Sequence, residues 1–166
     1  MLFRSDTLEV RRKEKSGFSW GGNSGRGAKI YITMPRITAA SSTGSGDMAV
    51  DRVEGDAFKV SVTGSGDLDI GSVNVQTLTV SLTGSGSIKT TGTARTGDLS
   101  VAGSGDIEAA KLSLSTASVS VLGSGGVSAA VAGPANVNVM GSGDVTLTGG
   151  AKCTTSKMGS GDISCS

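Results

Sequence analysis

The tripeptide Gly-Ser-Gly recurs at nearly constant spacing along this chain, and no other feature limits the fold so strongly. Successive copies lie 20, 20, 19, 20, 18 and 18 residues apart. A period near 20 is too long for a helical heptad and is typical of a solenoid, in which each repeat packs on its neighbours. The seven copies begin at Gly44, Gly64, Gly84, Gly103, Gly123, Gly141 and Gly159.

Apolar residues alternate with mostly polar ones on both sides of each copy. After the glycine pair, Leu68 and Ile70 flank a polar residue, and before the next copy Val80 and Leu82 flank Ser81. This period of two is the signature of short strands with one buried side. Between the two strands, stretches such as residues 71–76 predict a variable connection.

Stacked repeats of this kind place equivalent positions about 4.8 Å apart in parallel sheets. The sequence therefore predicts an all-β fold, a single-stranded right-handed parallel β-helix of about seven to eight coils of 18–20 residues. We expect one domain over residues 1–166. Residues 1–43 would form irregular coils, residues 44–158 the regular repeats and residues 159–166 a partial coil.

The two ends of the repeat array differ from its middle. Ile30 and Ile32 alternate like core residues and predict an imperfect coil, preceded by a strand near Thr7 and a glycine-rich loop. At the other end, Thr155 and Lys157 stand where earlier repeats have valine or leucine. We expect this coil to end the stack, because a lysine stem can cover the last core layer while its ammonium stays in water.

The residues of the repeated corner suggest structural roles first. Glycine permits positive φ and close approach of backbones, and we expect the serine hydroxyl to bond to the backbone or to the next serine. An acidic residue follows in most repeats, interrupted by Ser87 and Gly126. Solvated carboxylates that accept turn N–H groups explain this column, and the period is twice that of calcium-binding nonapeptide repeats. The column consists of Asp47, Asp67, Asp106, Asp144 and Asp162.

Cys153 and Cys165 both fall at inward positions, on either side of equivalent turns one coil apart. We expect a disulfide that stabilises the terminal coil by roughly 3 kcal/mol, as in exported proteins. Two buried thiols are the alternative.

Composition limits the classes of function that this protein can have. A net charge of +1 argues against a nucleic-acid partner, and no run of about 18 apolar residues predicts a transmembrane segment. Without histidine, Ser-His-Asp and Cys-His catalysis are excluded. Glycoside cleavage by a pair of carboxylates stays open as an alternative. However, only five aromatic residues are present on which a sugar ring could stack. The sequence predicts no catalytic residue, no metal and no cofactor.

Ice binding would require an unbroken threonine column. Such a column begins with Thr43, Thr63 and Thr83. The equivalent positions of the later repeats are not threonine but Ala102, Leu122, Met140 and Met158.

The segment "YITMPRI", the repeated "GSGD" units and the closing "AKCTTSKMGSGDISC" together resemble the bacterial putative auto-transporter adhesin, head GIN domain family, over residues 8–165. The resemblance implies a β-helix without established catalytic residues, usually exported behind a leader, whereas "MLFRSDTLEV" contains none. We expect a non-enzymatic adhesin-type binding or structural module that is periplasmic, at the cell surface or secreted. Its ligand would be an unknown protein or polysaccharide, and self-association stays open. The alternatives are a polysaccharide-binding or polysaccharide-cleaving enzyme and an intracellular scaffold.

Overall fold

The computed structural model of this protein describes residues 2–4, 7–9 and 36–166. The chain divides into two compact units, Met1–Thr33 and Met34–Ser166. In the first unit, β1 (Leu2–Arg4) and β2 (Thr7–Glu9) pair as an antiparallel ribbon. The strand expected near Thr7 is therefore present, and the predicted imperfect coil at Ile30 and Ile32 lies outside the described residues.

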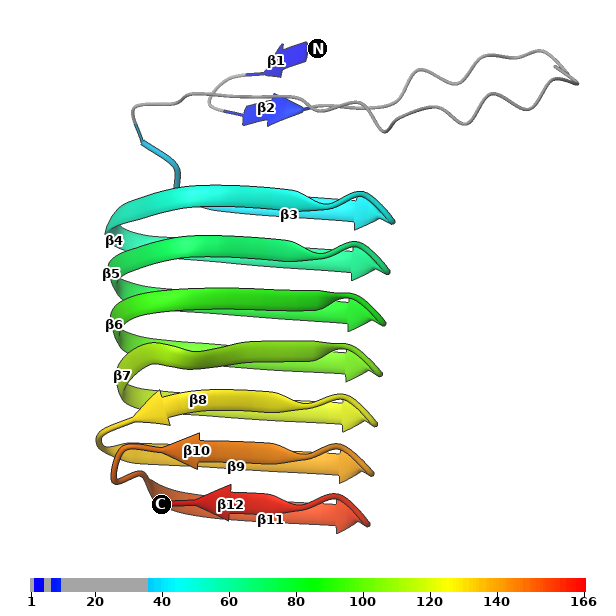
Figure 1. Cartoon of the computed structure of the whole chain (residues 1–166), viewed down its shortest axis with the longest axis vertical. Coiled ribbons are helices and arrows are strands. Elements are labelled where there is room, and N and C mark those ends of the chain that lie inside the picture. The colour runs from blue at the N-terminus through cyan, green and yellow to red at the C-terminus, as the bar shows by residue number, and fades with distance from the viewer. Residues whose placement is uncertain (1, 5–6, 10–35) are drawn as a thin grey trace, which may run out of the picture. The chain divides into compact units, whose positions relative to one another are not determined.

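The second unit is a stack of parallel strands, with no helix among the described residues (Figure 1). Its strands are β3 (Ala39–Gly44), β4 (Met48–Gly64), β5 (Leu68–Gly84), β6 (Ser87–Gly103), β7 (Asp106–Gly123), β8 (Val127–Val131), β9 (Pro134–Gly141), β10 (Val145–Thr148), β11 (Lys152–Gly159) and β12 (Ile163–Cys165).

Each turn of the stack has two layers of strand joined at one side by a Gly-Ser-Gly corner (Figure 1). The post-corner layer contains the first residues of β4, β5, β6 and β7 together with β8, β10 and β12. The pre-corner layer contains β3, the last residues of β4 to β7, β9 and β11. Pairing between turns is parallel throughout. The predicted all-β parallel solenoid is confirmed.

The predicted number of coils is too high. Seven corners delimit six complete turns, because each corner marks a boundary between turns. In the described residues before Gly44, β3 adds only the pre-corner half of a further turn.

The core is the thin space between the two layers, and the alternating residues found in the sequence fill it. Leu68, Ile70, Val80 and Leu82 are at most 1% exposed, and the other central turns repeat this arrangement. Thr90 is the one buried polar side chain in the described range, and its hydroxyl has no hydrogen-bond partner. The repeat pattern therefore predicts the aliphatic columns of the core, two in each layer, correctly.

The connection opposite the corner is more ordered than the sequence indicates. In β4 to β7 the strand continues through it, and it contributes buried residues such as Val73 and Leu112. The register shifts also lie here, for example between Ile70 and Val73. Differences in repeat length are absorbed on this side, so pairing in the pre-corner layer continues without a shift from β3 to β11.

The corner glycines are required by the close approach of successive turns. A Cβ on Gly86 would lie 2.1 Å from the carbonyl oxygen of Gly66, one turn earlier. The first glycine of the corner has a second constraint, since Gly84 adopts a φ of 122°, which is unfavourable for other residues. Each corner after the first thus excludes side chains at both of its glycines.

We predict that Gly86→Ala lowers the free energy of unfolding by about 2–4 kcal/mol, because the backbone must shift to admit the new Cβ. Gly46→Ala is the matched control, since this glycine holds the same place in the first corner and its Cβ would meet nothing within 4 Å. Urea denaturation of both variants measures the difference. Equal losses would show that glycine matters here for chain flexibility and not for the approach of the turns.

Candidate binding surface

The predicted aspartates follow the corners in one exposed column, and four of their carboxylates connect neighbouring turns. Each Oδ1 atom accepts the backbone N–H of the equivalent residue one turn later. The donor–acceptor distances are 3.2 Å for Asp47, 2.9 Å for Asp67, 2.7 Å for Asp106 and 2.9 Å for Asp144. These side chains therefore link neighbouring turns through hydrogen bonds.

Where Ser87 interrupts the aspartate column, a backbone carbonyl replaces the missing carboxylate as the hydrogen-bond acceptor. There the N–H of Asp106 donates to the carbonyl oxygen of Gly86 at 3.2 Å. No group of three or more His, Cys, Asp or Glu side chains in the described residues is arranged to hold a metal ion. The column is thus engaged in hydrogen bonds between turns.

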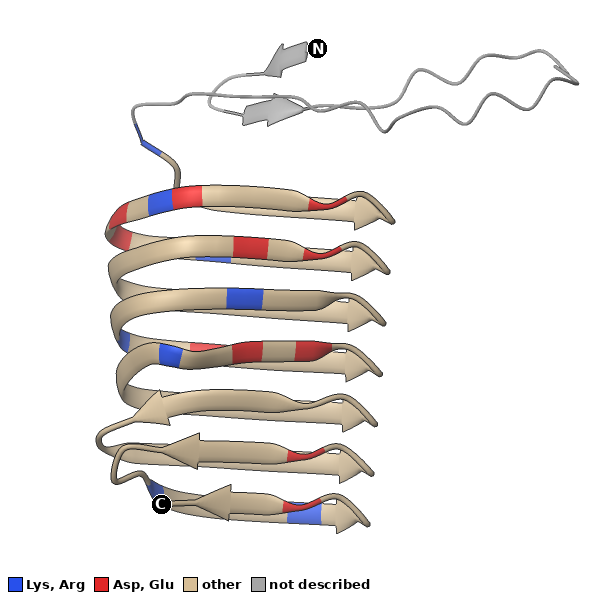
Figure 2. Cartoon of the chain, in the orientation of Figure 1, with Lys and Arg blue, Asp and Glu red and all other residues tan. Residues whose placement is uncertain are grey.

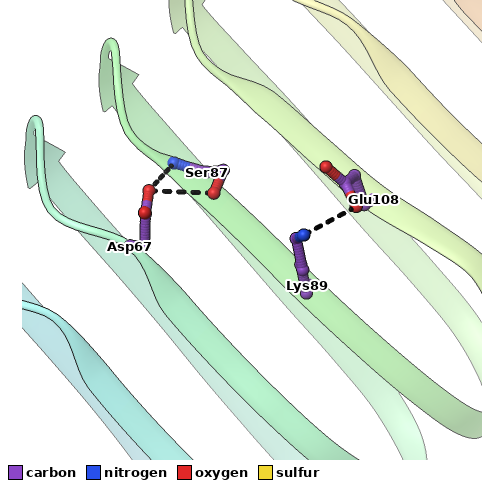
Figure 3. Close-up of polar contacts among 4 residues, drawn as sticks. All are labelled: Asp67, Ser87, Lys89 and Glu108. Carbon is purple, nitrogen blue, oxygen red and sulfur yellow. Dashed lines mark hydrogen bonds and ion pairs between the residues drawn. The ribbon is translucent and has the colours of Figure 1, made fainter.

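Asp67 has the most elaborate contact of the column (Figure 3). Its Oδ1 accepts the Ser87 hydroxyl at 2.8 Å as well as the Ser87 N–H. The Ser87 hydroxyl, the Ser87 N–H and the nearby Lys89 charge hold the pKa of Asp67 below its ordinary value. Because the folded-state pKa is depressed, the ionised carboxylate stabilises the fold above about pH 3.9, and this contribution is lost as pH falls through the folded value.

We predict that Ser87→Ala raises the pKa of Asp67, because the hydroxyl that donates to the carboxylate is removed while the N–H donor stays. NMR titration of the Asp67 carboxyl carbon measures the change. Ser85→Ala is the control, since that serine lies exposed at the preceding corner and makes no contact with Asp67. An unchanged pKa in Ser87→Ala, or an equal rise in both variants, would contradict the assignment.

The corner serines act through their backbone and not through their hydroxyls. The N–H of Ser85 donates to the carbonyl oxygen of Gly64 at 2.9 Å, and the other corners after the first repeat this bond. Among the described residues, no corner serine hydroxyl makes a hydrogen bond, so the predicted role for it is wrong. The side chain points to water because the inward side of the corner is closed by the preceding turn.

The two cysteines form a disulfide between β11 and β12, with 12 residues of sequence separation. Both are half-buried at the edge of the core. The bond joins the two layers of the last described turn.

We predict that replacing both Cys153 and Cys165 by alanine lowers the free energy of unfolding by about 3 kcal/mol, because the unfolded chain gains loop entropy. Denaturation without reductant compares the variant with wild type, and reduced wild type should match the variant. Thiol titration of unfolded, unreduced wild type should detect no free thiol. Two titratable thiols in protein from its native compartment would contradict the bridge.

The outer face of the post-corner layer carries much of the charge of the stack. Figure 2 shows red and blue concentrated on β4 to β7, whereas β8, β9 and β10 are tan. Lys89 Nζ lies 3.3 Å from a Glu108 carboxylate oxygen in the next turn (Figure 3), and Arg52 lies 3.7 Å from Glu54. These exposed pairs contribute little to stability.

The outer face of the pre-corner layer is different in character. Its outward positions form straight columns, because the register there has no shift. The two columns nearest the corners carry no charged side chain, whereas the next column includes Lys59 and Asp98. One column runs through Ser41, Ser61, Ser81, Ser100, Ser120, Asn138 and Ser156. Beside it, next to the corners, runs the column that begins with Thr43 and ends with Met158. We call the outer face of this layer the pre-corner face.

The column next to the corners changes from polar to apolar along the stack. Thr43, Thr63 and Thr83 are followed by Ala102 and then by three large apolar residues. Leu122, Met140 and Met158 are 55%, 43% and 67% exposed. In the described residues these are the exposed large apolar side chains, and all three stand in this one column.

A cleft of about 300 Å³ lies at the opposite end of the stack, lined by Arg36, Glu54, Asp56, Phe58 and Lys59 among others. Its carboxylates are exposed, and Glu54 is paired with Arg52.

A parallel β-solenoid with continuous polar columns on its outer face defines a repeat protein whose long flat faces are its candidate binding surfaces. The sequence matches the family described as "putative auto-transporter adhesin, head GIN domain" over residues 3–151, and the chain belongs to this family. No curated protein matches it. The described residues include no apolar helix of membrane-spanning length.

Two solved structures are similar to this chain. A putative adhesin from Bacteroides fragilis NCTC 9343 has 29% identity and a TM-score of 0.76, over 80% of this chain and 62% of its own. A putative lipid binding protein from Parabacteroides distasonis ATCC 8503 has 26% identity and a TM-score of 0.66, over 78% of this chain and 61% of its own. The chain thus spans about three fifths of each of these proteins.

Proposed function

We propose that this chain is a non-enzymatic, exported surface module that binds its ligand through the pre-corner face. One observation carries the proposal. A column of serine and asparagine runs without a register shift along the whole stack, and the column beside it changes from threonine to exposed apolar residues. Such a face offers many weak polar contacts in a fixed order and little charge that binding would have to desolvate.

Three further observations support export and a binding role. The disulfide between Cys153 and Cys165 suits an oxidising compartment. The family is described as adhesins, and one similar solved structure carries the same description. The absence of histidine, and the exposure of the cleft carboxylates Glu54 and Asp56, the first of them paired with Arg52, favour binding over catalysis.

The test uses matched substitutions on the two layers. Ser120 and Ser128 both point outward, Ser120 from the pre-corner part of β7 and Ser128 from β8 in the post-corner layer. We predict that Ser120→Glu weakens retention of the labelled protein on washed bacterial cells by about tenfold or more, because an unpaired charge enters the interface. Ser128→Glu should bind like wild type.

Circular dichroism and thermal unfolding verify that both variants keep the fold. Equal binding by the two variants would contradict the assignment to the pre-corner face. The same proteins are incubated with purified bacterial polysaccharides, and reducing ends are measured. Release of reducing ends by the wild type would contradict the non-enzymatic proposal and favour a polysaccharide-cleaving enzyme.

A further inference from the structure

Two of the five methionines of this chain stand side by side on the pre-corner face. Met140 in β9 and Met158 in β11 are paired in the parallel register, so their Cα atoms lie about 4.8 Å apart. Both side chains point outward, and they are 43% and 67% exposed. Methionine ordinarily fills gaps in a core. Here two thioethers on successive turns are instead kept in water.

The exposure of these side chains follows from the geometry of the face. Met140 is flanked by Leu122 in the turn before it and by Met158 in the turn after it, and it is still 43% exposed. In the next outward column stand Asn138 and Ser156, which are shorter than methionine. An outward methionine on this face is therefore accessible to a small solute even when a turn packs on each side of it.

Met48 provides an internal comparison among the described residues. It occupies the inward column of the post-corner layer, where it pairs with Leu68 and packs, partly buried, against the core. A methionine in this position must leave its core contacts before an oxidant can reach it. The described methionines thus divide into two outward side chains and one inward side chain.

The chemistry available to an exposed thioether is oxidation by a peroxide. The sulfur attacks one peroxide oxygen, an S–O bond forms and the O–O bond breaks. The sulfur loses two electrons to become a sulfoxide, and hydrogen peroxide is reduced to one molecule of water. The disulfide between Cys153 and Cys165 suits an oxidising compartment. In such a compartment exposed methionines meet oxidants of this class.

Oxidation at Met140 and Met158 changes the surface and leaves the core as it is. Successive residues of a strand point to opposite sides, so the buried neighbours Val137 and Val139 keep their packing. A sulfoxide is polar and accepts hydrogen bonds, which disrupts a core but is satisfied by water at the surface. Leu122 would then be the one large apolar side chain left in this column.

We propose that Met140 and Met158 form a paired oxidation site, at which a peroxide converts two turns of the pre-corner face from apolar to polar while the fold is retained. Reductases that act on methionine sulfoxide reverse the change. The inference stands apart from the proposed function, because it requires an oxidant and no ligand on the face.

The test exposes the folded full chain to hydrogen peroxide for increasing times and locates the added oxygen by mass spectrometry of its peptides. We expect Met140 and Met158 to be oxidised at least about fivefold faster than Met48, because they are accessible without any movement of the core. Thermal unfolding of protein oxidised at these two residues should shift by less than about 2 °C. Equal rates at Met48 and Met140, or a larger loss of thermal stability, would overturn the proposal.

A matched variant, Met140→Leu with Met158→Leu, connects the chemistry to the face. Leucine is similar to methionine in size and apolar character but has no sulfur to oxidise. On a hydrophobic interaction column, peroxide-treated wild type should elute earlier than untreated wild type, and methionine sulfoxide reductases for both epimers should restore its retention. The shift should be at least about threefold smaller in the variant. A shift of equal size would assign the change to other methionines and contradict the paired site.

Discussion

The approach of each corner glycine to the carbonyl oxygen of the glycine one turn earlier is the contact on which this structure depends. A Cβ on Gly64, Gly84 or Gly123 would lie 2.2 Å from that oxygen, so the turns are as close as two backbones can be. The N–H of the following serine donates to the same oxygen at 2.9–3.0 Å. Together these contacts fix both the spacing and the register of the turns at one side of the solenoid.

The register set at the corners determines what each face can do. Length differences between repeats are absorbed opposite the corners, where the pairing shifts at Ile70 and again near Thr91. The pre-corner layer is spared these shifts, so its serine, threonine and apolar residues stand in straight columns. A surface of this kind binds through repetition, because a weak contact made once is made again in the next turn at a fixed spacing.

The aspartate column illustrates how a repeated residue can look functional and yet be structural. Carboxylates about 5 Å apart beside glycine corners suggest a cation site. In the structure, Asp47, Asp67, Asp106 and Asp144 each accept an N–H from the next turn, and Asp106 keeps its own N–H bonded where Ser87 interrupts the column. The exposed large apolar residues of the described range are Leu122, Met140 and Met158, which the repeat consensus does not require.

The sequence by itself determined the parallel solenoid, the alternating core columns and the pairing of corners, because spacing near 20 residues and a period of two are local properties of the chain. It overcounted the turns, since motifs mark boundaries, and it missed the buried residues of the connection. Val73 and Leu112 each lie nine residues after the first glycine of their corner, but in the shorter repeat between them the paired position is Gly92. The sequence predicted a hydrogen bond from the hydroxyl of each corner serine, whereas in the structure the backbone N–H of that serine makes the bond to the preceding turn. The repeat alignment already placed Leu122, Met140 and Met158 in one column. Only the tertiary structure decided which face is regular and that these three side chains are exposed, because exposure and register depend on how the turns stack.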